Sequence, residues 1–274
     1  MSEVFVDLSR SADRLAGLLK QVGLDPGAAP PRVETLTGGV SSLLLKVTLP
    51  SLTVCVKQAL PRLRVEKEWC VPTERVFAEV AWLQRVEPLI PGHVPRVLGL
   101  DKTLKAFVME YLPAEQYRNW KTELLAGTVS APLAAEVGEL LGRIHAATAA
   151  DPDTAIAFDN DASFHALRLE PYLVETARQH PALRDHLQGL IDACGANRRA
   201  LVHGDISPKN ILSGSRGIVL LDAECASFGD PAFDLAFPLS HLLLKALHVG
   251  AVRAALTALT CGMLDAYTPY IDWE

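Results

Sequence analysis

The pattern of apolar residues along this chain of 274 residues changes near Pro113, and that change restricts the possible folds more than any other feature. Before Pro113, short apolar runs with β-branched residues are separated by turn residues, which is typical of antiparallel strands. After Pro113, apolar residues recur three to four positions apart over long segments, which is typical of helices. The sequence therefore predicts an α+β protein of two lobes, a small β-rich N-lobe (residues 1–110) and a larger helical C-lobe (residues 111–274).

The individual elements follow from the same periodicities. In the N-lobe we expect a helix over residues 12–22 and a second helix that begins at Thr73. In the second helix, Val76, Val80 and Leu83 are spaced to share one face. Strands are predicted at residues 43–48, 52–56, 94–100 and 106–110, helices at 131–147, 181–194 and 232–267, and a late strand pair at 210–212 and 217–222.

Composition and charge exclude several classes of protein. The chain is 49% hydrophobic and 21% charged, as soluble globular proteins are, which excludes a disordered or fibrous protein. A net charge of −6 argues against a nucleic-acid partner. The five cysteines include no close pair, so neither a disulfide framework nor a zinc site is indicated, and a reduced, cytoplasmic compartment is expected. The N-terminus lacks the apolar run of a secretory signal, and polar residues interrupt the apolar segment 235–259, which predicts a buried helix rather than a membrane span.

The strongest chemical signal is the segment from Leu201 to Glu224. Asp205 and Asn210 lie five positions apart on a loop, and Asp222 follows 17 positions after Asp205, at the end of the next strand. Phosphoryl transfer needs a carboxylate that orients and deprotonates an attacking hydroxyl, and oxygen ligands for magnesium. Asp205 fits the first role, and Asn210 and Asp222 fit the second. Glu224 would add another carboxylate on the same side if the chain remains extended there. The alternative is a surface loop with ordinary turn-forming residues.

The segment His203-Gly-Asp-Ile-Ser-Pro-Lys-Asn210 resembles the catalytic loop of the aminoglycoside phosphotransferase and choline kinase superfamily. That superfamily has a protein-kinase-like fold and acts mostly on small molecules. The resemblance implies ATP and Mg²⁺ as cofactors, Asp205 as the catalytic base, and Asn210 and Asp222 as metal ligands. It also makes His203 a structural anchor of the loop.

The N-lobe contains matching candidates for nucleotide binding. Lys57 ends an apolar strand, and Glu79 follows 22 positions later on a helix. In kinases such a pair holds the α- and β-phosphates, whereas taken alone these residues would be a strand-end lysine and a solvated glutamate. The loop 37–42 is a candidate phosphate-covering loop, and residues near 110–113 would link the lobes and receive adenine. The candidate nucleotide contacts of these two segments are Gly38, Gly39, Ser41, Ser42, Met109, Glu110 and Leu112.

A narrower resemblance, to the 5-methylthioribose kinase family, covers residues 56–69 and continues to Glu79. In that family a loop that carries a tryptophan covers the active site, and an Asp-x-Glu triplet like Asp222-Ala-Glu224 replaces Asp-Phe-Gly. Trp69, Arg62 and Arg64 are therefore candidate substrate residues. The segment 60–71 is expected to order over bound ligands.

These features predict an ATP-dependent kinase that phosphorylates a hydroxyl of a sugar-like or amino-alcohol metabolite. Its expected partners are ATP and a small-molecule substrate, with no nucleic acid and no membrane. A protein kinase is disfavoured because only 12 positions separate Asp222 from Asp234, too few for an activation segment. A nucleotide-binding scaffold without catalysis and an aminoglycoside phosphotransferase remain alternatives. Asp234 is expected to brace the loop or cap a helix, and His145 to be a core residue. A last expectation is a solvent-facing loop with four acids, Asp151, Asp153, Asp159 and Asp161.

Overall fold

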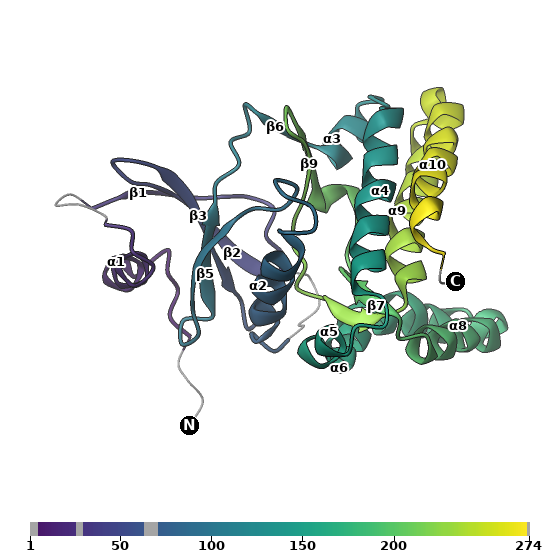
Figure 1. The fold of residues 1–274 in the computed structure, drawn as a ribbon, viewed down its shortest axis with the longest axis horizontal. Helices are drawn as coiled ribbons and strands as arrows, with labels where there is room; N and C mark the ends of the chain where they lie inside the picture. The colour runs from purple at the N-terminus through teal and green to yellow at the C-terminus, as the bar shows by residue number, and fades with distance from the viewer. Residues whose placement is uncertain (1–4, 26–29, 63–70, 273–274) are drawn as a thin grey trace. The chain divides into compact units, whose positions relative to one another are not determined.

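The computed structural model describes residues 5–25, 30–62 and 71–272. The chain folds into two units, Met1–Gln84 with Pro95–Leu112 and Arg85–Val94 with Pro113–Glu274. Each unit is described by itself (Figure 1). The first unit contains α1 (Ala12–Gln21), β1 (Arg32–Thr35), β2 (Ser42–Thr48), β3 (Thr53–Ala59), α2 (Arg75–Val86), β4 (Val97–Asp101) and β5 (Ala106–Glu110).

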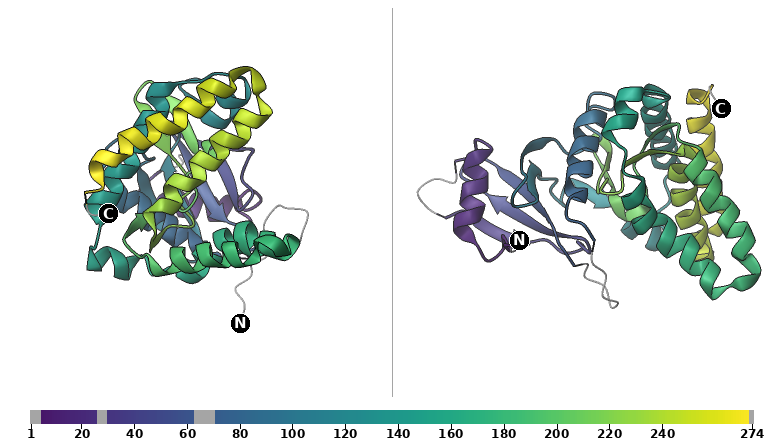
Figure 2. Two further views of the ribbon diagram at one scale, coloured as in Figure 1. Left: turned by 90° about the vertical axis from the view of Figure 1, so that its right-hand side faces the viewer. Right: turned by 90° about the horizontal axis from the view of Figure 1, so that it is seen from below.

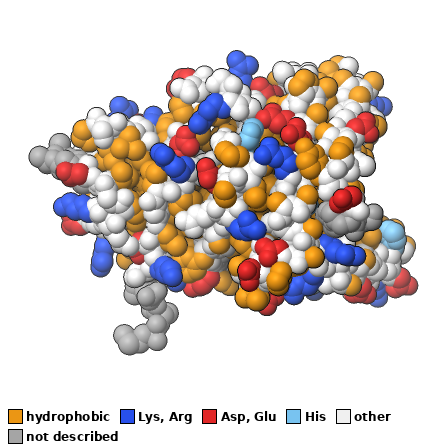
Figure 3. Space-filling model, viewed as in Figure 1, with side chains coloured by type: hydrophobic (Ala, Val, Ile, Leu, Met, Phe, Trp, Pro, Cys, Tyr) orange, Lys and Arg blue, Asp and Glu red, His pale blue; other side chains and the backbone are white. Residues whose placement is uncertain are grey.

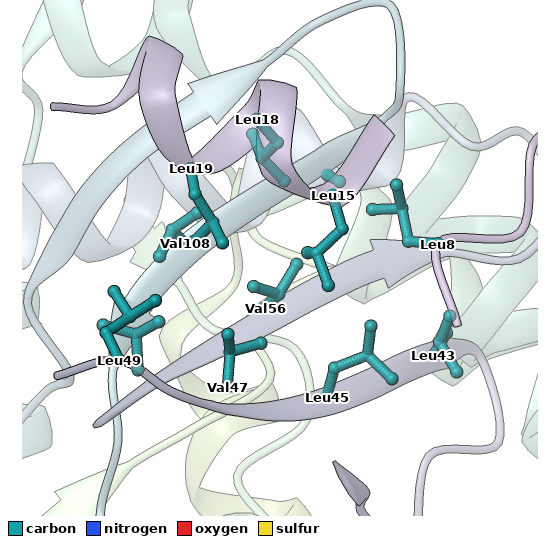
Figure 4. Packing of buried hydrophobic residues seen from close by; sticks show 12 residues of the cluster. Leu8, Leu15, Leu18, Leu19, Leu43, Leu45, Val47, Leu49, Val56 and Val108 are labelled. Carbon is teal, nitrogen blue, oxygen red and sulfur yellow. The ribbon is translucent and has the colours of Figure 1, made fainter. Parts of the chain in front are cut away.

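The first unit is built on an antiparallel sheet of five strands in the order β1-β2-β3-β5-β4. Helix α1 covers one face of this sheet, and Leu15, Leu18 and Leu19 of the helix point toward Val56 and Val108 of the strands (Figure 4). Successive side chains of a strand point to opposite faces. Because Val56 faces α1, its neighbour Lys57 faces the other side, on which α2 lies (Figure 1).

The second unit is mainly helical and contains three short strand pairings. Its elements are β6 (Tyr117–Asn119), α3 (Trp120–Leu125), α4 (Ala131–Thr148), α5 (Pro152–Ala157), α6 (Asp161–Phe164), the π-helix η1 (His165–Val174), α7 (Glu175–Gln179), η2 (Pro181–Leu183), α8 (Arg184–Ala196), β7 (Ala200–Val202), η3 (Pro208–Asn210), β8 (Ile211–Gly214), β9 (Gly217–Leu220), β10 (Ser227–Gly229), α9 (Pro231–His248), η4 (Gly250–Val252), α10 (Arg253–Tyr267) and η5 (Thr268–Tyr270). Helices α4, α9 and α10 pack together, and Figure 2 shows α9 beside α10. The predicted helices and strands are found, with strand ends shifted by up to three residues.

Helix α4 forms the centre of the second unit. Its inner face is buried at Val137, Leu140, Leu141 and Ile144, as the periodicity of the predicted helix 131–147 requires. Gly138 lets the backbone of α10 approach closely, because a Cβ atom at this position would lie 2.1 Å from the carbonyl oxygen of Met263. The contact between α4 and α10 therefore depends on the absence of a side chain at one position.

Three expectations about the second unit are wrong. Strands β6, β7 and β10 were not predicted, because segments of three residues are too short to show a period. The four acids at residues 151–161 lie in or beside two short helices rather than in one loop, although Asp153, Asp159 and Asp161 face solvent as expected. Asp151 caps α5 and pairs with Arg85, and Asp159 and Asp161 pair with Arg198.

The apolar segment 235–259 also differs from the expected buried helix. It forms α9 and the start of α10, and α9 leaves Leu243, Leu244 and Leu247 exposed. Within the described ranges no single helix is long and apolar enough to cross a membrane. Only Pro231–His248 and Gly250–Tyr270 taken together, across a bend of 114°, meet that test of length and composition.

Charged side chains of both signs are interspersed on the face of the molecule that Figure 3 shows. On that face Lys and Arg side chains alternate with Asp and Glu side chains and do not gather into one broad basic patch.

Candidate active site

Asp234 braces the loop that carries Asp205. The carboxylate of Asp234 accepts hydrogen bonds from the backbone N–H of His203 at 2.6 Å and of Gly204 at 2.8 Å. His145, fully buried on α4, lies 3.3 Å from the same carboxylate and 3.0 Å from the Tyr267 hydroxyl. Asp234 therefore braces the loop, and His145 is a hydrogen-bonded core residue, as the sequence predicts.

His203 anchors the loop through both ring nitrogens. Its Nδ1 accepts a hydrogen bond from the backbone N–H of Asp205 at 3.1 Å, so Nε2 carries the proton and donates it to the Leu221 carbonyl at 3.0 Å. Burial lowers the pKa of His203, against the opposing charges of Asp234 and Asp205. Gly204 has a φ of +76°, and a Cβ atom there would lie 2.8 Å from the Cys225 carbonyl oxygen. These constraints fix the backbone on which Asp205 stands.

Asp205 is 2% exposed and lies between two cations. Its Oδ2 is 2.7 Å from Nη2 of Arg168 and 3.2 Å from Nζ of Lys209. Arg168 is itself buried, and its other donors are directed at the carbonyls of Gly204 at 2.6 Å and Leu167 at 2.7 Å. Burial acts to lower the pKa of Lys209, but the charges of Asp205 and Asp222 outweigh this effect and the pKa is raised. The carboxylate is thus fixed in one orientation.

The candidate metal ligands supply the hard oxygen donors that magnesium prefers. Nδ2 of Asn210 donates to the backbone carbonyl of Asp205 at 3.0 Å, which leaves the amide oxygen for a cation. Asp222 has a φ of +69°, a backbone conformation that is rare for residues other than glycine and that often occurs at functional positions. Within the described ranges, no three His, Cys, Asp or Glu side chains form a cation site by themselves. The oxygen donors of Asn210 and Asp222 are of the type that fits magnesium.

The expected geometry at Glu224 is wrong in one respect. Strand β9 ends at Leu220, and the left-handed residue Asp222 turns the chain, so Glu224 is not carried to the side of Asp222 by an extended strand. Glu224 is 7% exposed. Its charge, like that of Asp205, acts on Arg168.

In the first unit, Lys57 of β3 and Glu79 of α2 form the predicted ion pair. Nζ of Lys57 lies 2.7 Å from Oε1 and 2.6 Å from Oε2 of Glu79, and both side chains are at most 5% exposed. Burial raises the pKa of the adjacent Cys55 thiol to about 12, so this cysteine is a protonated core residue. A buried pair with this geometry presents a cation at a fixed position on the sheet.

The Gly-Gly loop joins β1 to β2. Gly38 has a φ of +100°, and a Cβ atom on Gly39 would lie 2.2 Å from the Ser42 carbonyl oxygen, so both positions require glycine. Ser41 and Ser42 are buried. Nη2 of Arg75 donates to the Ser41 carbonyl and, at 2.9 Å, to the Leu60 carbonyl. Arg75 thereby ties this loop to the start of α2.

The structure describes only some of the remaining candidate nucleotide and substrate residues. Met109 and Glu110 end β5, and Leu112 is the last residue of the first unit before Pro113. Arg62 is exposed. Trp69 and Arg64, and with them most of the expected lid 60–71, lie outside the described residues.

A profile of the phosphotransferase enzyme family APH matches residues 22–270. The chain belongs to this family. The methylthioribose kinase of Pectobacterium atrosepticum is 29% identical over 219 residues, which are 70% of this chain and 54% of that protein. The chain spans about half the length of the curated relatives it matches. The resemblance inferred from the catalytic-loop motif is therefore confirmed.

Two solved structures show the family fold. A spectinomycin phosphotransferase in complex with ADP and spectinomycin has a TM-score of 0.57 at 12% identity, covering 95% of this chain and 86% of that one. A choline/ethanolamine kinase family protein from Mesorhizobium loti has a TM-score of 0.53 at 14% identity, covering 96% and 94%. The predicted two-lobed, protein-kinase-like fold is thus confirmed.

In this member of the phosphotransferase family, sequence reasoning missed Arg168 and Arg75. Arg168 lies 36 positions before Gly204, its hydrogen-bond partner, in a segment for which no element was predicted. One signal was present, namely Pro171, which lacks the N–H that an α-helix would direct at the Leu167 carbonyl. That carbonyl accepts from Arg168. No sequence pattern indicated the contacts of Arg75, because an arginine in the first turn of a helix is common.

Proposed function

We propose that this phosphotransferase transfers the γ-phosphate of ATP to a hydroxyl of a small, sugar-like metabolite. The observation that carries the proposal is the environment of Asp205, a buried carboxylate on a braced loop with Asn210 five positions away. The relatives named methylthioribose kinase support a sugar-like acceptor.

Each group has a defined role in this reaction. The Asp205 carboxylate accepts the hydroxyl proton while the hydroxyl oxygen attacks the γ-phosphorus and the bond to the departing ADP oxygen breaks. Arg168 keeps the carboxylate in place. Lys57, held by Glu79, binds phosphate oxygens, and the backbone of residues 37–42 covers them. Asn210, Asp222 and Glu224 would hold magnesium, which when bound neutralises charge on the phosphates.

The decisive variant is Asp205→Asn, which keeps the shape of the side chain and removes the proton acceptor. We expect phosphoryl transfer, measured as ADP release with a panel of hydroxylated metabolites, to fall by a factor of about 10² to 10⁴. ATP binding measured by calorimetry should persist, because other residues hold the phosphates. Asp265→Asn, at an exposed position on α10, is the matched control and should retain full activity. Near-normal turnover in Asp205→Asn would show that Asp205 is not the base.

A further inference from the structure

Helix α9 carries a row of side chains that begins at the catalytic loop. Asp234, in its first turn, braces that loop. Phe237 follows three positions later, and His241 and Lys245 each four positions after that, so these side chains lie along one side of the helix. The ring centroid of Phe237 is 5.9 Å from the guanidinium carbon of Arg168, the cation that contacts Asp205. The row therefore starts beside the catalytic carboxylate and ends in two basic residues.

Lys245 is a buried cation without an acidic partner. It is 7% exposed, and its Nζ makes one long hydrogen bond of 3.5 Å, to the His241 carbonyl. Across residues 5–25, 30–62 and 71–272, no carboxylate lies within ion-pair distance of this ammonium group. Burial lowers the pKa of Lys245, and the like charge of Lys121 lowers it further. Buried lysines are normally paired, so this side chain lacks the anion that its position calls for.

The charges around His241 are mostly positive. Its pKa is lowered by burial first and then by Lys245, Lys209 and Lys121, while Asp205 alone among these neighbours acts in the opposite direction. Lys121 comes from α3, Lys209 from η3 and Lys245 from α9, so the positive charges that act on His241 belong to three separate elements. His241 packs against Phe237, with ring centroids 5.3 Å apart, and Phe237 lies beside Arg168, the partner of Asp205. The basic residues of α9 therefore follow directly on the surroundings of Asp205.

We propose that the alcohol phosphorylated by this protein carries an acidic group, a carboxylate or a phosphate, that binds at Lys245 and His241 while its hydroxyl reaches Asp205. This inference rests on the proposed function and specifies its substrate class. An anionic group would supply the partner that Lys245 lacks, and a charge-assisted hydrogen bond to it would fix the acceptor relative to the base. A polycationic aminoglycoside would be repelled by the same residues.

The test uses the full chain with Mg·ATP and acceptors that differ by one acidic group. Glycerol is compared with glycerate and glycerol 3-phosphate, and ribose with ribonate and ribose 5-phosphate, by ADP release and by calorimetric binding. At least one acid should exceed its neutral counterpart in kcat/KM by about tenfold or more, and the two kinds of acid show whether carboxylate or phosphate is preferred. Lys245→Met should remove this preference by raising KM for the acid, with turnover of the neutral counterpart unchanged.

Two further measurements keep the result interpretable. Lys102→Met, at an exposed position in the first unit, is the matched control and should behave as the wild type. The midpoint of thermal unfolding of Lys245→Met should be equal to or higher than that of the wild type, because the substitution removes an unpaired buried charge. A clearly lower midpoint would mean that Lys245 is structural, and would overturn the inference.

The outcomes separate this inference from the proposed function. Preference for the neutral acceptors, or an equal loss for charged and neutral acceptors in Lys245→Met, overturns the anionic substrate and leaves phosphoryl transfer intact. If no acceptor is phosphorylated, the proposed function is contradicted, and binding still decides the inference. In that case, acids that bind the wild type but not Lys245→Met support the anionic substrate site. Acids that bind neither protein overturn it.

Discussion

At the scale of one residue, Asp205 shows how neighbouring charges fix the position of the proposed catalytic base. Arg168 contacts it with a planar, buried guanidinium that is also bound to two backbone carbonyls, so this partner cannot move far. The Lys209 side chain is 53% exposed, so this second partner is less constrained than Arg168. The buried guanidinium therefore does most to position the carboxylate.

His203 provides a prediction about pH. Its folded-state pKa is depressed by burial, so the neutral ring is favoured by folding, and stability is fully present above the unfolded pKa of about 6.5 and is lost as the pH falls. Protonation would also displace the Asp205 N–H from Nδ1. Below pH 6.5 this one group should lower the free energy of unfolding by up to ~1.4 kcal/mol per pH unit.

Chemical denaturation between pH 7.5 and 5.5 checks this prediction. His203→Asn should lose less stability across this range than the wild type, because it has no group to protonate. His186→Gln, at an exposed position of α8, should keep the pH dependence of the wild type. Equal pH dependence in the wild type and His203→Asn would contradict the prediction.

At the scale of elements, the packing of α4 against α10 depends on Gly138. A methyl group at this position would lie 2.1 Å from a backbone oxygen of Met263, and a backbone cannot rotate away as a side chain can. We expect Gly138→Ala to lower the free energy of unfolding by ~1–3 kcal/mol through overpacking, measured by denaturant titration.

Gly189 is the matched control for Gly138. It lies in α8, and a Cβ atom there would have no neighbour within 4 Å. Gly189→Ala should leave stability unchanged or raise it by up to ~1 kcal/mol, because alanine favours the helix more than glycine does. Equal effects of the two substitutions would show that the close approach of α4 and α10 is not specific to Gly138.

At the scale of the whole molecule, magnesium-dependent ATP binding tests the proposed metal ligands. Asp222→Ala should abolish magnesium-dependent ATP binding, because this residue is the proposed metal ligand that follows the β8–β9 hairpin. Glu224→Gln should weaken binding less, since it would remove only one of several oxygen ligands. Calorimetry of ATP with and without magnesium measures both effects. Wild-type binding and turnover in Glu224→Gln would mean that Glu224 does not contact the metal.

Local patterns in the sequence determined much of this protein. The spacing of apolar residues predicted α1, four of the five strands of the first unit and the helix α4, because burial of one face requires a period that is visible within a short window. Alternation along β3 places Lys57 opposite the core under α1, where it meets Glu79. The loop from His203 to Asn210 was recognisable because its candidate catalytic groups lie close together in sequence.

Only the tertiary structure decided the partners of those groups. Arg168, Lys209 and Asp205 meet because a π-helix, a 3₁₀ turn and a braced loop converge, and no single stretch of sequence contains all three elements. The lack of a carboxylate partner for Lys245 among the described residues is likewise a property of the fold, because it depends on which segments pack around α9. Periodicity reports which face of an element is buried, but the identity of the group packed against that face depends on contacts between segments far apart in the chain.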